Sequence, residues 1–478
     1  SSSHSAASCR IGLLLRDLMA GTISSIAVAY DTQGSLATTH KSHGTDMGLY
    51  GGLLGWQSDD DRLENYHQEL SRHGIAAQVS YGEFNDAHPN TYRLQVKNES
   101  FGHSVIAVST GGGMIEIQQI DETPVSICGD YHELLIFTDT PERLKEFVGS
   151  LFSVEQMQIC RGKVSFVQLK SYHPFEPSLI DKIKTREGVR FVRNLRPVLP
   201  ILSSEKVTVP FLSCDEMLEI AEKDKLSLWQ AALRYESQRS LLGEEQVLEK
   251  MVHLIGIMED SITKGLSGTD YDDRILHCQS AAFKARMDQG ALLGGELLNT
   301  IIMYVTAIME VKSSFGVIVA APTAGSCGAL PGAVIGAGHV LGKSVHEIAK
   351  AMLAACVPAI FISEHASFAG EVGGCQAECG SGSSMAAAGL ASLAGGNLKQ
   401  CMAAASFALQ NVLGLICDPI GNRVEAPCLG RNIMAASNAL ASANMALSGY
   451  DPIVSFDEVV AAMHEAGTSI KHELRCTA

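Results

Sequence analysis

The stretch SMAAAGLASLAGGNLKQCMAAASFALQ, residues 384–410, is dominated by alanine and contains almost no charge. Helices that are apolar on several faces lie at the centre of a bundle, and alanine allows neighbouring helices to approach closely. The stretch therefore predicts buried helices in the middle of a helical domain.

This helical pattern extends over residues 214–478. Leu, Met and Ala recur at helical spacing, as in EEQVLEKMVHLIGIMEDSI (244–262). The segments 344–352 and 455–467 each begin with Ser-x-x-Glu, the sequence of a capping box. We therefore predict an all-α domain from 214 to 478.

The most apolar run in the chain is TIIMYVTAIMEVKSSFGVIVAA, residues 300–321. It contains Glu310 and Lys312, and a membrane span needs about 20 predominantly apolar residues. We expect a buried helix that passes into a strand, and no membrane association.

Residues 1–122 mix short strands, turns and a helix, the pattern of an α+β domain. Strands are predicted at 25–32, 91–98, 104–110 and 114–120, and a helix that ends at a glycine is predicted at 62–74. The first residues, SSSHSAASCRIGLLL, lack the basic start and cleavage site of a secretory signal. We expect the chain to begin within a loop.

Residues 123–197 predict a second α+β module. The order is strand, helix, two strands, helix and strand, over 133–139, 140–152, 156–162, 164–171, 178–185 and 189–196. This βαββαβ order is that of the ferredoxin-like module. The proline-bearing segment 198–213 is predicted to be a linker.

Composition narrows the class of protein. The chain has 478 residues, which suffices for three domains, and its formal net charge of −16 argues against nucleic-acid and anionic-membrane partners. Thirteen cysteines, an odd number, occur in a large chain without a recognisable signal. This favours a cytoplasmic protein with free thiols or metal ligands.

Three glycine-rich breaks interrupt the helical domain, and each contains cysteine. They are APTAGSCG (321–328), GEVGGCQAECGSGSSMAAAG (370–389) and LICDPIGNRVEAPC (415–428). Irregular backbone in a core usually surrounds a ligand, because its N–H groups need partners. One such cysteine would most often be a packing residue, but three breaks suggest that thiols converge on one centre.

Sulfur ligands without histidine favour zinc or an iron–sulfur cluster. The paired C-x-x-C knuckles of structural zinc sites are missing from the sequence. Three separate cysteines would leave one iron of a cluster open, where it could act as a Lewis acid on a hydroxyl. Spacing alone leaves both metals possible.

Eight blocks, in order along nearly the whole chain, resemble signature segments of bacterial iron–sulfur L-serine dehydratases (L-serine ammonia-lyases). They are SSSHSAA, KSHGTD, AHPNT, STGGGMIEI, APTAGSCG, GEVGGCQAECGSGSSMAAAGLA, GLICDPIGNRVEAPCLGRN and KHELRCT. The resemblance implies a β-type domain (1–122), an ACT-like domain (123–197) and a catalytic α domain (214–478) in one chain.

The resemblance also implies the cofactor. Cys375, Cys417 and Cys428 match the ligands of a [4Fe–4S] cluster. Cys379 is expected to be a small packing residue, and Cys327 is expected nearer the substrate. Some family members fill the open iron with a cysteine near the C-terminus, and Cys476 is a weak match for that role.

The implied reaction converts L-serine to pyruvate and ammonia by β-elimination of water without pyridoxal phosphate. His43 is the first candidate for the base, with Asp46 as a possible orienting partner; His4 is the second and His88 the third, because imidazole titrates near neutral pH. All three histidines lie in the first domain, so the active site is expected between that domain and the helical one.

The resemblance and the loop chemistry suggest further substrate contacts. The candidates are Ser1, Ser2, Ser3, Lys41, Thr45, Asp46, Thr323, Ser326 and Ser383. Helix capping is an equal explanation for Ser383. Arg431 and Asn432 could hydrogen-bond the cluster or the substrate, although a structural pair between Arg431 and Glu425 is the favoured reading.

Two alternatives remain open at this point. The same elimination could act on L-threonine, L-cysteine or another 3-substituted amino acid, or the protein could be a non-catalytic cysteine–metal protein with an amino-acid-sensing module. The first strand–helix turn of the ACT-like module, TDTPERL, lacks the glycine of ligand-binding versions. A packing role or a homodimer contact is therefore expected for that module.

Overall fold

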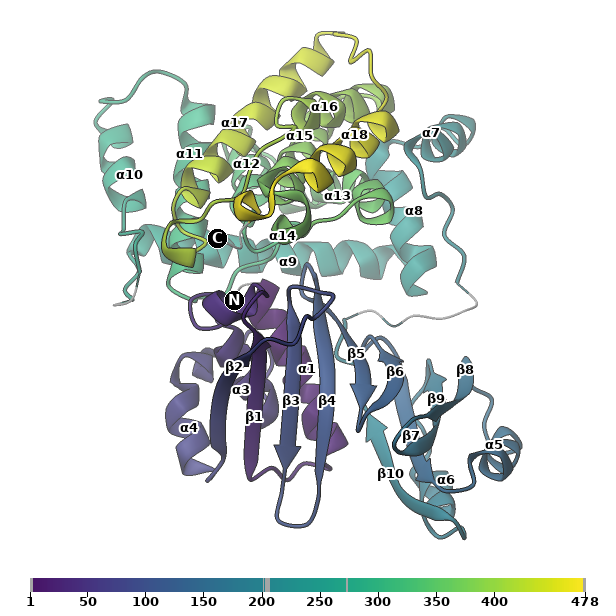
Figure 1. Ribbon diagram of the computed structural model, residues 1–478. Helices are drawn as coiled ribbons and strands as arrows, with labels where there is room; N and C mark the ends of the chain where they lie inside the picture. Colours follow the sequence, from purple (N-terminus) through teal and green to yellow (C-terminus); the bar gives the residue numbers. More distant parts are fainter. Residues whose placement is uncertain (1–2, 201, 203–206, 272–273, 476–478) are drawn as a thin grey trace. The chain divides into compact units, whose positions relative to one another are not determined.

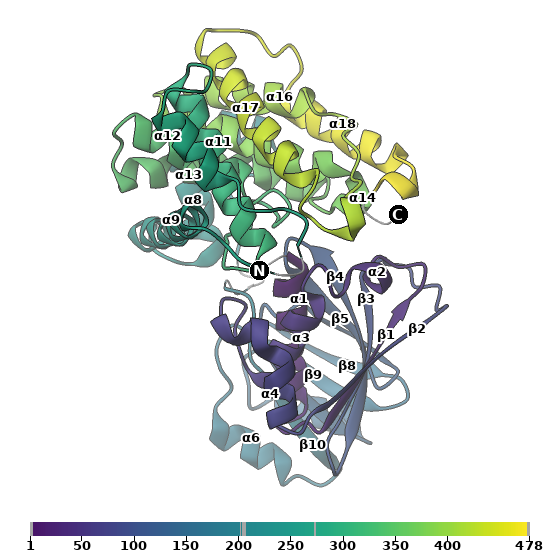
Figure 2. The ribbon, with the colours of Figure 1, turned by 90° about the vertical axis from the view of Figure 1, so that its left-hand side faces the viewer.

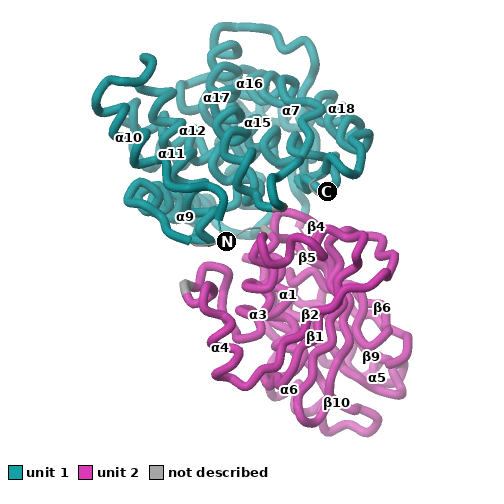
Figure 3. The backbone as a smooth tube through the Cα atoms, turned by 60° about the vertical axis from the view of Figure 1, so that its left-hand side comes forward, with its two compact units in different colours: residues 1–3, 208–478 teal, residues 4–207 magenta. Residues whose placement is uncertain are grey.

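The structure is a computed structural model that describes residues 3–200, 202, 207–271 and 274–475. The chain divides into two compact units (Figure 3). The N-terminal unit is His4–Val207, and the helical unit is Thr208–Ala478 together with the first three residues.

A six-stranded sheet forms the first part of the N-terminal unit. Its strands are β1 (Ser25–Asp31), β2 (Ala76–Gly82), β3 (Thr91–Lys97), β4 (Gly102–Gly111), β5 (Met114–Ile120) and β6 (Thr123–Ile127), in the order β2-β1-β3-β4-β5-β6. Helices α1 (Ser3–Leu18), α3 (Thr45–Leu54) and α4 (Tyr66–Arg72) lie on one face of it (Figure 2). The short helix α2 spans Leu36–Thr39. The α+β prediction is confirmed.

Some local predictions for this part are wrong. The described residues begin with α1 at Ser3 and not with a loop, because a run of buried apolar residues such as Ile11 and Leu15 packs on the sheet. The predicted helix at 62–74 is split into a 3₁₀ turn (Asp61–Asn65) followed by α4. Strand β6 belongs to the first sheet, although the expected boundary at residue 122 would assign it to the second module.

The second sheet has the predicted βαββαβ order. Its elements are β7 (His132–Thr138), α5 (Pro141–Gly149), β8 (Gln156–Arg161), β9 (Ser165–Ser171), α6 (Pro177–Lys184) and β10 (Val189–Leu195), and the antiparallel strands have the order β10-β7-β9-β8. Phe137 and Phe166 of this sheet pack in the same core as Ile117 of the first sheet. The two sheets therefore share buried apolar surface, which is the main favourable contribution to folding.

The helical unit confirms the all-α prediction. Its helices are α7 (Cys214–Lys223), α8 (Leu228–Ser240), α9 (Glu244–Ser267), α10 (Ser280–Asp288), α11 (Glu296–Ser313), α12 (Ala329–Val340), α13 (Val345–His365), α14 (Gly370–Gly373), α15 (Ser381–Leu393), α16 (Leu398–Gln410), α17 (Cys428–Leu447) and α18 (Phe456–Ser469) (Figure 1). Ser344 and Ser455 cap α13 and α18 in the predicted capping boxes.

The strand expected after the apolar helix α11 does not form. Residues 314–320 are irregular, and Phe315 has a positive φ of 56° at the helix end. A strand needs a neighbour for its backbone N–H and C=O groups, and the nearest elements here are helices. Helix α13 is long and apolar enough to cross a membrane, but 61% of its apolar window is buried within the protein, as in a core helix.

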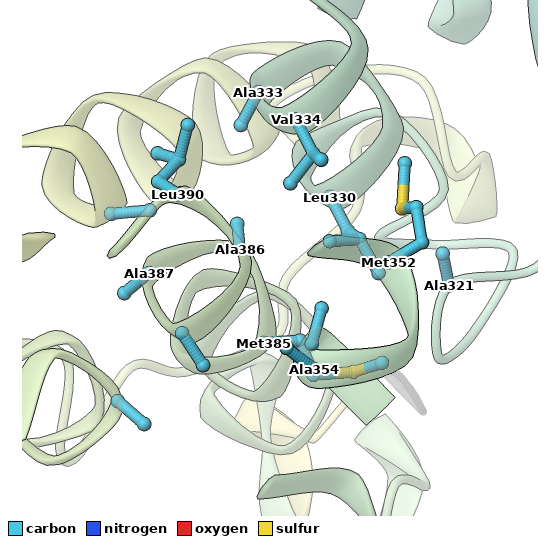
Figure 4. Packing of buried hydrophobic residues seen from close by; sticks show 14 of the residues in the cluster. Ala321, Leu330, Ala333, Val334, Met352, Ala354, Met385, Ala386, Ala387 and Leu390 are labelled. Carbon is cyan, nitrogen blue, oxygen red and sulfur yellow. The ribbon is translucent and has the colours of Figure 1, made fainter. Parts of the chain in front are cut away.

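Small residues allow the central helix α15 to pack closely against its neighbours. A Cβ atom on Gly389 would lie 2.9 Å from Val334 of α12 and 3.1 Å from Ala355 of α13. Figure 4 shows side chains of α12 and α15, including Ala386 and Leu390, in one packed cluster. The alanine-rich stretch is thus at the centre of the helical unit, as predicted.

The irregular part of the glycine-rich segments is shorter than the sequence predicts. The segments before α12 and α17 are irregular, but most of 370–389 is helical, with a π-helical turn (Gln376–Gly380) between α14 and α15. Single π-helical turns occur often at functional sites. This turn directly follows Cys375.

Candidate metal centre and histidine cluster

Two thiols and one carboxylate of the helical unit form a group that could hold a metal ion. The ligand atoms of Cys375, Glu378 and Cys417 all lie within 4.8 Å of one another. Cys375 comes from the start of the π-helical turn, and Cys417 from the loop between α16 and α17. Both thiols are almost fully buried. We refer to these three residues as the thiol group.

Gln376 links the chain segment that carries Cys375 to the segment that carries Cys417. Its side-chain amide donates to the carbonyl of Met463 and accepts from the N–H of Gly414, each at 2.8 Å, and its own N–H donates to the carbonyl of Leu415 at 3.1 Å. Gly374 adopts a positive φ of 73°, and a Cβ there would lie 2.7 Å from the Leu415 carbonyl. Glycine is therefore required where the two chain segments meet.

The C-terminal segment holds Cys417 from the other side. The N–H of Cys417 donates to the carbonyl of Leu474 at 2.8 Å, and Cys417 forms an isolated parallel bridge with Arg475. The Arg475 guanidinium donates to the carbonyl of Val372, just before the first thiol, at 3.2 Å. Cys476 lies outside the described residues.

Hydrogen bonds favour the charged form of Cys375. The thiols of Cys379 and Cys417 and the guanidinium of Arg431 lower the pKa of Cys375 well below its usual range, against the opposing effect of burial. The pKa of Cys379 is raised because its thiol donates to Cys375 and is buried. Since the thiolate is the form that binds metals, this arrangement suits a ligand role for Cys375. Cys379 was expected only to pack, but it hydrogen-bonds Cys375.

Glu378 is a functional candidate that the sequence interpretation missed. Its carboxylate accepts a hydrogen bond of 2.9 Å from the Thr323 hydroxyl, and a Cβ on Gly325 would lie 2.6 Å from it. Burial and the neighbouring Cys375 raise the pKa of Glu378 to about 8. The contact with Thr323 joins the glycine loop before α12 to the thiol group.

Lys312 of α11 is a second residue that the sequence interpretation passed over. Its ammonium group donates to the carbonyl of Val424 and interacts electrostatically with Cys428 and Cys327. Burial lowers the pKa of Lys312. The residue had been considered only as a charge that argues against a membrane span.

Cys428 is the first residue of α17 and is buried, but it lies outside the 4.8 Å thiol group. Asn432 positions it: the Asn432 amide donates to the carbonyls of Cys428 at 2.9 Å and Gly325 at 2.8 Å. The amide oxygen accepts from the N–H groups of Gly328 and Ala329, both at 3.1 Å. Asn432 thus links the start of α17 to the glycine loop.

The other predicted residues of the helical unit have identifiable contacts. The hydroxyls of Thr323 and Ser326 are 3.2 Å apart and buried beside Glu378. Ser383 does not cap a helix; it lies within α15 and donates to the carbonyl of Ala435 in α17 at 2.7 Å. Cys327 packs with its sulfur 3.8 Å from that of Met309.

Arg431 pairs with Asp418, so the favoured pairing with Glu425 is wrong. The Glu425 carboxylate instead accepts from the N–H groups of Ile275 and Leu276 and from Arg423. Asp418 directly follows Cys417, so this ion pair keeps Arg431 beside the thiol group.

The N-terminal unit contains a histidine cluster, which we define as His4, His40 and His43. The rings of His4 and His43 are 4.9 Å apart in an edge-to-face arrangement. His43 is only 2% exposed. Asp46, expected as a partner of His43, contacts His40 through its carboxylate at 2.8 Å, and the other ring nitrogen of His40 is 2.7 Å from the Tyr81 hydroxyl.

The remaining predicted residues of the first domain differ in burial and contacts. Thr45 is buried at the start of α3, whereas Lys41 is exposed. His88 is half-buried, and its Nδ1 accepts from the N–H of Asn90 at 3.1 Å. Ser1 and Ser2 lie outside the described residues, as does the side chain of Ser3.

The donor set suits a metal. Thiolate sulfur selects zinc, copper(I) and iron–sulfur clusters over magnesium or calcium. A buried thiolate without a metal or a cation would be costly, and Arg431 is the cation that interacts with Cys375 here.

The segment that contains the thiol group is similar in sequence to known proteins. The family described as "Serine dehydratase alpha chain" matches residues 223–478. The chain is 36% identical to the "L-serine dehydratase, alpha chain" of Peptoniphilus asaccharolyticus, over 55% of its own length and 90% of that protein. The corresponding "Probable L-serine dehydratase, alpha chain" of Bacillus subtilis is 33% identical, over 56% and 89%. The match to "L-serine dehydratase 2" of Escherichia coli, 25% identical, covers 100% of this chain and 94% of that protein.

Proposed function

The chain belongs to the serine dehydratase alpha chain family, and from this premise we propose that it is an L-serine dehydratase that converts L-serine to pyruvate and ammonia. It is then a metal-dependent lyase. The observation that carries the proposal is the thiol group, which lies inside the segment that the family matches.

The proposed cofactor is a [4Fe–4S] cluster held by Cys375, Cys417 and Cys428. Its support is the sulfur-rich donor set, the low pKa of Cys375 and the burial of all three thiols. Such a cluster supplies a Lewis acid for the hydroxyl that leaves the substrate. Three protein ligands would leave one iron for that role.

The surrounding side chains have proposed roles in binding and orientation. Thr323 and Ser326 are proposed to bind the substrate carboxylate, for which the Thr323 hydroxyl would exchange its bond to Glu378 and the Ser326 hydroxyl its bond to the Ala321 carbonyl. Arg431 and Asn432 keep Cys375 and Cys428 in place. Ser383 is a further candidate, whose hydroxyl donates to the carbonyl of Ala435 in α17.

His43 is proposed as the base that removes the α-proton of the substrate, and the adjacent His4 as its partner or substitute. Imidazole is suited to this step because its pKa lies near neutral pH. The edge-to-face contact with His4 fixes the orientation of the His43 ring. Lys41, Thr45 and the first three serines remain proposed substrate contacts.

We propose that the second sheet of the N-terminal unit is an ACT-type module with a role in packing or in a homodimer. Its support is the βαββαβ order with the strand order β10-β7-β9-β8. The first strand–helix turn has Pro141 and no glycine, which argues against amino-acid binding at that turn. A cytoplasmic location is proposed because the twelve described cysteines are free thiols.

An anaerobic assay tests the proposed function. The purified chain is supplied with L-serine, L-threonine or L-cysteine, and the release of ammonia and of the 2-oxo acid is measured. We expect turnover of L-serine that is lost on exposure to air or to an iron chelator. Failure of metal-loaded protein to release ammonia from L-serine would contradict the proposal, and faster release from L-threonine or L-cysteine would reassign the substrate.

A further inference from the structure

A cavity of about 390 Å³ lies at the junction of the two sheets in the N-terminal unit. Residues of β4, β7 and β10 line it, together with the start of β9. The lining includes Phe101, His103, Phe137, Ser165, Phe191 and Arg193. The cavity is thus composed of aromatic rings with a few polar groups among them, the usual composition of a small-molecule site.

His103 offers an unused hydrogen-bonding atom at this cavity. The residue is only 5% exposed, and its Nδ1 lies 2.6 Å from the Asp121 carboxylate. Its Nε2 is buried and has no hydrogen-bond partner among the described residues. Because a buried polar atom without a partner costs free energy, the atom favours a bound group that would satisfy it.

The Asp121 side chain is fixed by the turn between β5 and β6. Asp121 and Glu122 have positive φ angles of 49° and 59°, an uncommon conformation for residues other than glycine. The second carboxylate oxygen of Asp121 accepts from the N–H of Ser104 at 2.8 Å. The orientation of the His103 ring is therefore determined by backbone contacts as well as by packing.

Arg193 brings a positive charge to the cavity and forms no ion pair among the described residues; Asp121, the carboxylate of the lining, is bound to His103 instead. Its guanidinium is half-buried and lies over the rings of Phe101 and Phe191, at 4.7 and 4.5 Å. It donates to the carbonyls of Leu18 and Val192. Burial lowers the pKa of Arg193, which reflects the cost of the uncompensated charge.

Arg190, the other arginine that lines the cavity, is paired with a carboxylate. It is exposed and forms a two-point ion pair with Asp139. The neighbouring Phe137 and Phe191 rings are stacked at 4.3 Å. The charge left for a ligand is therefore that of Arg193, and the aromatic rings beside it offer an apolar surface.

We propose that this cavity is a binding site for a small organic carboxylate with an apolar body. The carboxylate would pair with Arg193 and the apolar body would lie among the phenyl rings. A hydroxyl beside the carboxylate, in a ligand that has one, would donate to the Nε2 of His103. This site is independent of the thiol group and of the histidine cluster, and it lies outside residues 223–478, which the family matches. It therefore goes beyond the proposed function and does not depend on it.

The test is titration calorimetry of the full-length protein, without substrate, with 3-phenylpropionate. We expect one saturable site per chain with a Kd of about 1 mM or tighter. The uncharged isostere 3-phenylpropan-1-ol and inorganic phosphate are expected to bind at least about tenfold more weakly, because each lacks one of the two features that the cavity recognises.

Two variants probe the site in different ways. Arg193→Met removes the charge, and Ser165→Phe fills the cavity without changing Arg193 or His103; each is expected to weaken binding by about tenfold or more. Arg143→Met, at an exposed arginine of α5 that is not part of the lining, is the matched control and should bind as the wild type does. Thermal melting verifies that each variant is folded.

The proposal is overturned if the wild type shows no saturable binding of 3-phenylpropionate, or if the alcohol binds equally well. Tight binding of phosphate would replace it by a site for bare anions. If Arg193→Met does not fold, Ser165→Phe decides the question, and unchanged binding by that variant would place the ligand elsewhere. Because the readout is binding, a failure of the proposed elimination does not affect it.

Discussion

The thiol group and the histidine cluster are stabilised in different ways. Cys375 and Cys417 are 42 residues apart and are brought together by hydrogen bonds from Gln376 and by the C-terminal segment. His40 and His43 lie on one short segment, and only His4 comes from elsewhere. The thiol group therefore depends on tertiary contacts, whereas the histidine cluster depends mainly on the local fold around α2 and α3.

The largest effect is expected from the thiol group itself. Cys375→Ser removes a proposed ligand, and we expect the rate of pyruvate formation from L-serine to fall by more than about 1,000-fold, because metal catalysis contributes several kcal/mol to the transition state. Cys401→Ser is the control, since Cys401 is also buried in the helical unit but, among the described residues, bonds the carbonyl of Gly396 and not the thiol group. Equal activity of the two variants would remove Cys375 from the centre.

A substitution in the histidine cluster should lower the reaction rate without changing the metal content. His43→Ala is expected to lower kcat by about 100- to 10,000-fold, the usual contribution of a general base, while iron content stays at the wild-type value. The exposed His73 at the end of α4 provides the control, His73→Ala, which should leave kcat unchanged. A variant His43→Ala with nearly normal kcat would exclude this residue as the base.

A change remote from catalysis should distinguish the two regions. Gln376→Leu keeps the volume of the side chain but leaves the Met463 carbonyl and the Gly414 N–H without their partner, at a cost of about 2–4 kcal/mol of stability. We expect a lower melting temperature and weaker iron retention. Gln400→Leu likewise removes two side-chain hydrogen bonds, one at the start of α16 and one to the carbonyl of Leu447, but neither involves the thiol group. It should cost about 1–2 kcal/mol and retain its iron. If Gln376→Leu keeps the wild-type iron content, the thiol group does not depend on this residue.

The smallest effect is expected from a helix cap. Ser344→Ala removes the capping hydrogen bond to the N–H of Glu347 and should lower stability by about 1 kcal/mol without a change in kcat. Thermal melting and the pyruvate assay measure the two quantities on one sample. A loss of activity larger than the loss of folded protein would show that α13 affects the centre directly.

Local and periodic features were predictable from the sequence. The capping boxes at Ser344 and Ser455, the strands with alternating apolar residues and the alanine-rich centre all follow from local rules, and all are present. Strand β2 was missed because most of it is exposed, so it lacks a buried face that would show in the pattern. The apolar residues after α11 were misjudged because strand formation depends on a neighbouring strand, which sequence periodicity does not reveal.

The candidate site was predictable only in part. The grouping of Cys375 with Cys417 was expected from the cysteine-bearing breaks, and the structure brings both thiols together. Glu378 lies three residues after Cys375, so its approach depends on the π-helical turn, which the sequence pattern did not predict. Lys312 approaches Cys428 and Cys327 through helix packing, which spacing in the chain does not reveal. The pairing of Asp46 with His40 shows the same limit, since both His40 and His43 lie within six residues of this carboxylate.

The central claim is that cysteines from separate helix breaks hold an iron–sulfur cluster, and the most direct test is the iron and acid-labile sulfide content of protein purified without oxygen. The wild type should contain about four iron and four sulfide per chain, as a [4Fe–4S] cluster requires, and Cys417→Ser should lose most of both. Wild-type protein that contains zinc without sulfide, or a Cys417→Ser variant with the full iron content, would contradict the account.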